Sequence, residues 1–121
     1  MSGATAPAVR VELLWWAGCP SHPRALSELR QELASLGHDP ASVSVREVRS
    51  DEEAVAERFV GSPTIRVDGV DLFEAGEGQP ATLTCRVYKL RDGRFSPTPD
   101  VADLREALGR ALAGARPPSG R

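Results

Sequence analysis

The most constraining feature of this sequence is residues 9–16, VRVELLWW, whose pattern changes along their length. Apolar and polar side chains alternate up to Glu12, and every side chain from Leu13 to Trp16 is apolar. The pattern is typical of a strand that begins half exposed and ends buried on both faces, as in a central parallel sheet. A sheet with such a strand has helices over its faces, and 121 residues suit one small domain of that kind.

A helix and a second strand are predicted next. Four leucines recur at spacings of three, four and three residues, which is the pattern of an amphipathic helix: Leu26, Leu29, Leu33 and Leu36. Gly37 is suited to follow the end of this helix, because glycine readily adopts the left-handed conformation found there. Residues 43–48 (VSVREV) predict the second strand.

A capping pattern predicts a second, short helix. Glu53 follows Ser50 by three residues, the spacing at which a serine caps a helix and the acid reaches back to the cap. Val55 and Phe59, four residues apart, would form the buried edge of this helix, and Gly61 would end it.

Two short strands joined by a tight turn are predicted after that helix. Residues 64–67 (TIRV) form the first and residues 70–72 (VDL) the second, with Asp68-Gly69 as the hairpin turn. Residues 74–80 contain two glycines, a proline and two acids, and indicate an exposed loop.

The last part of the chain predicts an extended segment, a second turn and a helix. Apolar and polar side chains alternate over residues 82–87 (TLTCRV), and Asp92-Gly93 is a second tight-turn sequence. Thr98 would cap the last helix, with Pro99 at its first position. The inner face of this helix would be formed by Val101, Leu104, Leu108 and Leu112.

The predicted order is therefore β-α-β-α-β-β-α, with the extended segment inserted before the last helix. We expect the first three strands to be parallel, through right-handed crossovers, and the hairpin strand to be antiparallel. The fold class is α/β, a mixed sheet flanked by helices. The domain would span residues 8–113, with residues 1–7 and 114–121 as flexible termini.

Charge and apolar patterning exclude several classes of function. The chain has 17 acidic and 15 basic residues, so the basic surface of a nucleic-acid-binding protein is not expected. No apolar run reaches the roughly 18 residues of a membrane span, so we expect no membrane association. The start, MSGATAPAV, does not resemble a signal peptide, and we expect a cytoplasmic protein. Two cysteines are too few for a disulfide framework or a four-cysteine zinc site, and no cofactor is expected.

Cys19 is the first candidate for chemistry, because it lies where a buried strand gives way to a helix. The positive end of a helix dipole stabilises a thiolate and lowers the pKa of its thiol. His22, three residues on, could add charge or a hydrogen bond. Pro23 conflicts with a helix capped at Cys19, whereas a cap at Ser21 removes the conflict and leaves Cys19 two residues before the helix.

The sequence around Cys19 resembles that of the thioredoxin superfamily. Cys19-Pro20-Ser21-His22 falls where that superfamily carries Cys-x-x-Cys, and Ser62-Pro63-Thr64 looks like its cis-proline loop. The chain also resembles a narrower group, the small bacterial thioredoxin-family proteins that are often labelled alkylmercury lyase-like. That resemblance covers residues 9–112 and is carried by Gly18-Cys19-Pro20, Gly61-Ser62-Pro63-Thr64, Val67-Asp68-Gly69 and Cys85-Arg86-Val87-Tyr88.

The resemblance implies a thioredoxin-like fold and a thiol that exchanges with disulfides of proteins or small molecules. Cys19 would attack as a thiolate, and Pro63 would lie against it. The residues expected to bind the substrate are Trp16, Pro20, Ser21, Ser62, Pro63 and Thr64. His22 replaces the usual second cysteine, so Cys85 is the available resolving thiol, provided that the fold brings the two together.

Two other functions stay open. Cys19 and Cys85, with or without His22, could bind a soft metal such as mercury, copper(I) or zinc, because thiolates favour these ions. The chain could also be a non-catalytic thioredoxin-like interaction module, since a fold does not determine a function. Cys85 could equally pack inward with Leu83 and Val87.

Overall fold

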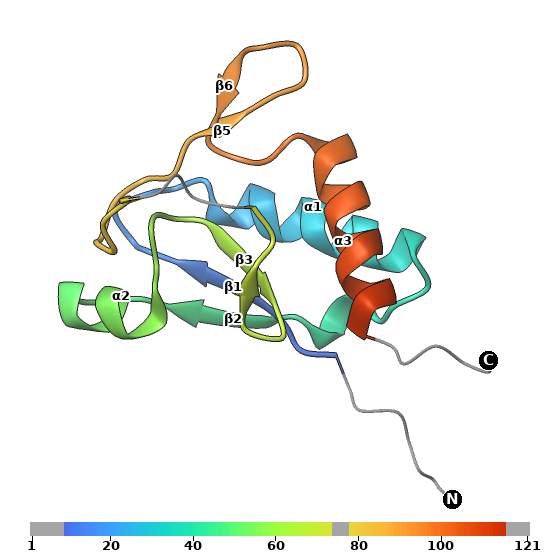
Figure 1. Ribbon diagram of the computed structural model, residues 1–121, viewed down its shortest axis with the longest axis horizontal. Coiled ribbons are helices and arrows are strands. Elements are labelled where there is room, and N and C mark those ends of the chain that lie inside the picture. The colour runs from blue at the N-terminus through green and yellow to red at the C-terminus, as the bar shows by residue number, and fades with distance from the viewer. Residues whose placement is uncertain (1–8, 74–77, 116–121) are drawn as a thin grey trace, which may run out of the picture.

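A four-stranded sheet forms the centre of the structure. The computed structural model describes residues 9–73 and 78–115 of the chain (Figure 1). The strands are β1 (Val11–Trp15), β2 (Ser44–Glu47), β3 (Thr64–Val67) and β4 (Val70–Asp71), and they lie in the order β2-β1-β3-β4. The predicted central position of the first strand is confirmed, and the chain is a mixed α/β structure.

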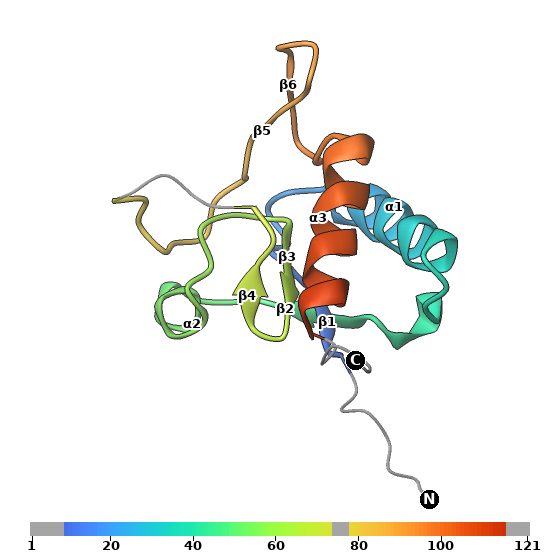
Figure 2. The ribbon, with the colours of Figure 1, turned by 45° about the vertical axis from the view of Figure 1, so that its right-hand side comes forward.

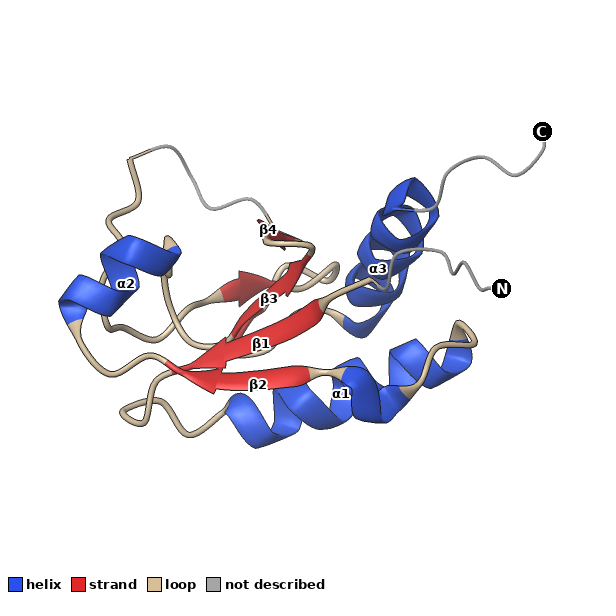
Figure 3. Cartoon of the chain, turned by 90° about the horizontal axis from the view of Figure 1, so that it is seen from below, coloured by secondary structure: helices blue, strands red, loops and turns tan. Residues whose placement is uncertain are grey.

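The direction of β3 differs from our prediction. β1 pairs with β2 in parallel, with Leu13 opposite Val45, but β3 runs antiparallel to β1, with Leu13 opposite Ile65. A parallel strand would need a crossover that returns the chain along the sheet. The intervening helix α2 (Asp51–Glu57) is too short for that, and it lies at the end of the sheet to which β1 and β2 point (Figure 3). The chain therefore enters β3 from that end.

The predicted hairpin is confirmed. β3 and β4 are antiparallel, and Asp68 and Gly69 between them both have positive φ angles, 52° and 82°. Two central residues with positive φ are the mark of the turn that matches the twist of a two-stranded ribbon.

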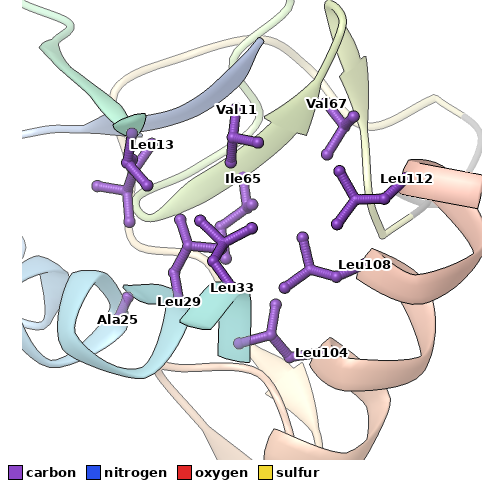
Figure 4. Packing of buried hydrophobic residues seen from close by; sticks show 11 residues of the cluster. Val11, Leu13, Ala25, Leu29, Leu33, Ile65, Val67, Leu104, Leu108 and Leu112 are labelled. Atoms are coloured by element: carbon purple, nitrogen blue, oxygen red, sulfur yellow. The ribbon is translucent and has the colours of Figure 1, made fainter. Parts of the chain in front are cut away.

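One face of the sheet packs against two long helices, α1 (His22–Ser35) and α3 (Val101–Ala115), which lie side by side (Figures 1 and 2). Figure 4 shows leucines of both helices pointing toward the inward side chains of β1 and β3. This core contains Val11, Leu13, Ala25, Leu29, Leu33, Val43, Ile65, Val67, Leu104, Leu108 and Leu112. Arg105 on α3 also donates to the buried Glu32 on α1 over 2.6 Å.

The ends of α1 and α3 test the predicted caps. Ser21 is the N-cap of α1, as Pro23 requires, and Gly37 follows its C-terminus with φ 83°. In α3 the predicted cap Thr98 is wrong, because the Asp100 carboxylate accepts from the backbone N–H groups of Ala102 and Asp103. The helix thus starts two residues later than a Thr98 cap would allow.

Two further features of α3 correct the sequence analysis. Val101, predicted on the inner face, is exposed, because it stands at the first position beside the cap. The helix also continues to Ala115, so residues 114 and 115 are helical and do not belong to a tail. The rest of the two predicted flexible termini lies outside the described residues.

The opposite face of the sheet carries a smaller cluster: Leu14, Val48, Ala54 and Phe59. Phe59 is fully buried, as predicted, but Val55 is 64% exposed and does not form the buried edge of α2. The helix ends at Glu57 and not near Gly61, because Arg58 takes the left-handed conformation. Phe59 therefore reaches the sheet from the turn after the helix, and only Ala54 of the helix is buried.

The predicted cap of α2 is present in altered form. The Ser50 hydroxyl accepts from the backbone N–H of Glu53 (3.1 Å). The Glu53 carboxylate reaches back to the N–H of Arg49 (2.8 Å), one residue before the cap.

In the sequence between β4 and α3, the chain forms a hairpin of two short strands, β5 (Tyr88–Lys89) and β6 (Phe95–Ser96). The hairpin projects from the rest of the protein (Figures 1 and 2). Its turn contains the predicted Asp92-Gly93, with φ 94° at Gly93. A 3₁₀ helix, η1 (Pro40–Ser42), precedes β2. Within the described ranges, every helix is too short or too polar to cross a membrane. Part of the predicted loop, residues 74–77, lies outside those ranges.

We expect Phe59→Ala to destabilise the protein by about 3–5 kcal/mol, because it leaves a cavity in the smaller cluster. Val55→Ala, four residues earlier in α2, is the control and should change the free energy of unfolding by less than about 0.5 kcal/mol, because Val55 is exposed. Urea unfolding monitored by circular dichroism measures both. Equal losses would mean that α2 packs through Val55, as the sequence pattern predicts.

Candidate functional site

The two cysteines of the chain form a disulfide. Cys19 and Cys85 are 66 residues apart in sequence, and their Cα atoms are 5.6 Å apart. This separation lies within the range that a disulfide bridges without backbone movement. The structure therefore brings together the two thiols whose proximity the sequence leaves open.

Cys19 lies in the turn between β1 and α1. Its backbone N–H donates to the Trp16 carbonyl (3.0 Å), and the residue is only 3% exposed. It precedes the N-cap, Ser21, by two residues, and the Ser21 side chain makes no capping hydrogen bond. The Ser21 hydroxyl oxygen is buried and has no hydrogen-bond partner among the described residues. Pro20, between them, is exposed.

His22 stands beside the disulfide without bonding to it. Its ring stacks on Trp15, with ring centroids 4.1 Å apart and planes inclined by 13°. Its Nδ1 atom lies 3.5 Å from the carbonyl oxygen of Cys19, and the described residues include no hydrogen bond from this ring to a sulfur. His22 therefore shapes the turn around Cys19 through packing and a backbone contact.

Cys85 lies next to the loop that contains Pro63. The Ser62–Pro63 peptide bond is cis, as predicted, and Ser62 pairs with Cys85 in a parallel bridge. The N–H of Ser62 donates to the Thr84 carbonyl (2.8 Å), and its carbonyl accepts from the N–H of Arg86 (2.9 Å). Residues 84–86 are thereby fixed against the loop on both sides of Cys85.

The predicted substrate-binding residues of this loop are buried. Ser62, Pro63 and Thr64 have almost no exposed surface. The Ser62 hydroxyl accepts from the N–H of Trp16 (3.0 Å), and the Thr64 hydroxyl donates to the Gly61 carbonyl (2.6 Å). Trp16 is half-buried and packs on the smaller cluster. These side chains hold the loop in place, whereas Pro20 and Cys85 are at the surface.

The side chains that the Cys85 segment turns toward the protein are not the ones that its apolar–polar alternation suggests. Arg86 and Tyr88 are buried, whereas Cys85 and Val87 are exposed. The inward packing of Cys85 and Val87 that we considered is therefore wrong. Arg86 and Tyr88 turn inward because each finds buried polar partners there.

Arg86 connects the cysteine segment to the sheet. Its guanidinium donates to the Asp71 carboxylate (2.8 Å), the Thr64 hydroxyl (3.2 Å) and the Phe73 carbonyl (2.5 Å). It also lies over the ring of Tyr88, 4.9 Å from the centroid, in cation–π geometry. The side chain is only 8% exposed. The opposite charge of Asp71 and the other acceptors around it compensate for the cost of burying its charge.

Tyr88 fixes the proline loop from the other side. Its hydroxyl donates to the Pro63 carbonyl (2.5 Å), and its ring packs edge-on against Phe73. Burial raises the pKa of Tyr88 well above its ordinary value, against the opposing effect of the Arg86 charge. The hydroxyl therefore stays protonated and donates throughout the physiological pH range.

Asp51 holds the start of the same segment. Its carboxylate accepts from the Leu83 N–H (3.1 Å) and the Thr82 hydroxyl (2.9 Å). These two hydrogen bonds, that of Leu83 first, lower the pKa of Asp51 below its ordinary value. Asp51, the first residue of α2, thus also anchors the cysteine segment. From the sequence, Arg86 and Tyr88 stand out only as members of the motif at residues 85–88, and their burial and this role of Asp51 were missed, because the partners of all three are distant in sequence.

The site offers a sulfur pair and no larger metal-binding set. Among the described residues, no group of three or more His, Cys, Asp or Glu side chains could hold a metal ion. Tetrahedral zinc, which takes four ligands, is therefore a poor fit to the side chains around Cys19 and Cys85.

Comparisons with protein families, with curated proteins and with solved structures found no match to this chain. We therefore infer its function from the geometry of the disulfide site and from the short motifs around it.

We expect Gly61→Ala to weaken the disulfide and destabilise the fold by about 1–3 kcal/mol, because Gly61 has φ 147°, where side chains are strained. An added Cβ would also lie 2.8 Å from the Cβ of Arg86 and 3.0 Å from its backbone N, displacing the segment next to Cys85. Chemical unfolding and titration with dithiothreitol measure the two effects.

Gly109→Ala is the control for this substitution. Gly109 lies in α3 with nothing within 4 Å of an added Cβ, so alanine should stabilise the helix by up to about 1 kcal/mol and leave the dithiothreitol titration unchanged. An unchanged titration in Gly61→Ala would show that the close approach of Gly61 to Arg86 does not control the sulfur pair.

Proposed function

We propose that this protein is a thioredoxin-like thiol–disulfide exchange protein whose redox couple is Cys19–Cys85. The observation that carries the proposal is the disulfide itself. It joins the turn before α1 to the segment beside Pro63, and one of its two residues is at the surface. A disulfide with one accessible sulfur can exchange with external thiols, whereas a fully buried one is protected from them.

Three features support the thioredoxin-like part of the proposal. The element order is β-α-β-α-β-β-α around a mixed sheet, with β5 and β6 inserted before α3. Cys19 stands just before the first long helix, and the Pro63 loop lies next to the cysteine pair. These are the features in which the sequence resembles that superfamily.

The exchange reaction is balanced by a partner that carries two thiols. One partner thiolate attacks the protein disulfide, so that a mixed disulfide forms and one cysteine leaves as a thiolate. The second partner thiolate then attacks the mixed disulfide and releases the other cysteine. The partner is oxidised to a disulfide and the protein is reduced to a dithiol, and the reverse sequence reduces a partner disulfide. A cytoplasmic location would favour such a role, because disulfides there are usually transient.

We expect the folded protein to equilibrate reversibly with mixtures of reduced and oxidised dithiothreitol, and to pass its disulfide to a model peptide with two thiols. Quantifying thiols after acid quenching measures the first, and mass spectrometry of the peptide measures the second. The Cys19→Ser/Cys85→Ser double variant is the control and should do neither. A disulfide that opens only after the protein unfolds would mark it as a structural staple and would refute an exchange function.

A second candidate function is binding of a soft metal ion by the reduced pair. The observation that favours this function is the 5.6 Å separation of the two Cα atoms, which places the two sulfurs close enough to share one ion. Thiolates select soft ions such as copper(I) or mercury(II). The described residues add no third ligand, which suits an ion satisfied by two thiolates better than zinc.

Titration of the reduced protein with copper(I) under anaerobic conditions tests this candidate. We expect one ion per protein, and a loss of affinity of at least about tenfold in Cys85→Ala, since a single thiolate remains. His22→Ala should bind as tightly as the original protein, because the His22 ring contacts the Cys19 backbone and not the sulfur. Equal affinity in the original protein and in Cys85→Ala would exclude a two-sulfur site.

A further inference from the structure

The two cysteines of the disulfide differ in exposure. Cys19 lies in the turn that precedes α1 and is 3% exposed, whereas Cys85 is an exposed residue of its segment. Thiol–disulfide exchange proceeds by attack of a thiolate on one of the two sulfurs, and access decides which one is attacked. A partner that approaches the folded protein therefore meets the sulfur of Cys85 first.

The segment around Cys85 is held without the help of the disulfide. Backbone hydrogen bonds to Ser62 fix Thr84 and Arg86, the residues on either side of Cys85. The Arg86 guanidinium is bound to Asp71 and to two further acceptors, and Tyr88 donates to the Pro63 carbonyl. Removing the segment from the loop would separate the buried Arg86 guanidinium from the half-buried Asp71 carboxylate, which is unfavourable. Opening the disulfide therefore leaves Cys19 covered and Cys85 at the surface.

We propose that Cys85 is the sulfur that exchanges with partners, and that Cys19 is the internal sulfur that leaves and re-forms the disulfide. This assignment rests on the proposed exchange function and reverses the roles that the position of Cys19 suggests in the sequence. A partner thiolate forms a bond to the Cys85 sulfur, the Cys19–Cys85 bond breaks, and its electron pair goes to Cys19 as a thiolate. In the reducing direction the Cys85 thiolate attacks a partner disulfide. The Cys19 thiolate then attacks Cys85 and releases the second partner thiolate.

The burial of Cys19 suits an internal sulfur. Cys19 lies in the turn before α1 and is only 3% exposed, so an external thiol has little access to it while the protein is folded.

Two single-thiol variants test the assignment. Each is incubated with glutathione disulfide at neutral pH, and the mixed disulfide is followed by mass spectrometry. We expect Cys19→Ser, which keeps Cys85, to react at least about tenfold faster than Cys85→Ser, because exposure controls the rate. In guanidinium chloride the two variants should react at similar rates, since unfolding exposes both thiols. Faster reaction of the folded Cys85→Ser variant would overturn the proposal.

A second measurement uses the unsubstituted protein, in case a variant does not fold. The oxidised protein is treated briefly with excess reduced glutathione, quenched in acid, unfolded and alkylated. Peptide mapping should find glutathione on Cys85 and the alkyl group on Cys19. The opposite distribution would overturn the assignment while leaving the exchange function intact. A disulfide that glutathione does not open at all in the folded protein would refute both.

Discussion

The placement of the cysteine pair depends on one buried cation. Arg86 follows Cys85 directly and is bound to Asp71 at the end of β4, to Thr64 at the start of β3, and to the Phe73 carbonyl. A guanidinium presents its donors in a fixed planar fork, so several acceptors at different places determine its orientation closely. Through this side chain, the edge of the sheet sets where the residue next to Cys85 lies, and therefore which way Cys85 faces.

Much of the fold could be predicted from the sequence, because the relevant patterns are local. The first strand, the stripe of leucines in α1 and the Asp68-Gly69 turn follow from the spacing of a few neighbouring residues. The direction of β3 does not follow from such local patterns. It depends on the end of the sheet at which α2 lies, because the chain enters β3 from that end. Val55 misleads for a related reason: the helical spacing places it on the same face as Phe59 only if the helix continues, and Arg58 ends it.

The candidate site divides in the same way. Cys19 and Pro63 could be singled out because each stands in a short motif at the boundary of an element. The burial of Arg86 and Tyr88 could not, since it depends on Asp71, Thr64 and Pro63, which lie 15 or more residues away. Polar side chains normally face solvent, so an apolar–polar alternation predicts that the apolar side chains point inward. This prediction is wrong where distant hydrogen-bond partners allow an arginine to be buried.

The pairing of Ser62 with residues 84–86 has a consequence for how partners would be chosen. Both backbone hydrogen-bonding groups of Ser62 are already used within the chain. An extended partner could not add itself to this loop as another strand unless it displaced the segment that Arg86 holds. Selectivity would then come from the shape and charge around one accessible sulfur, and the amino-acid sequence beside the partner's cysteine would matter little.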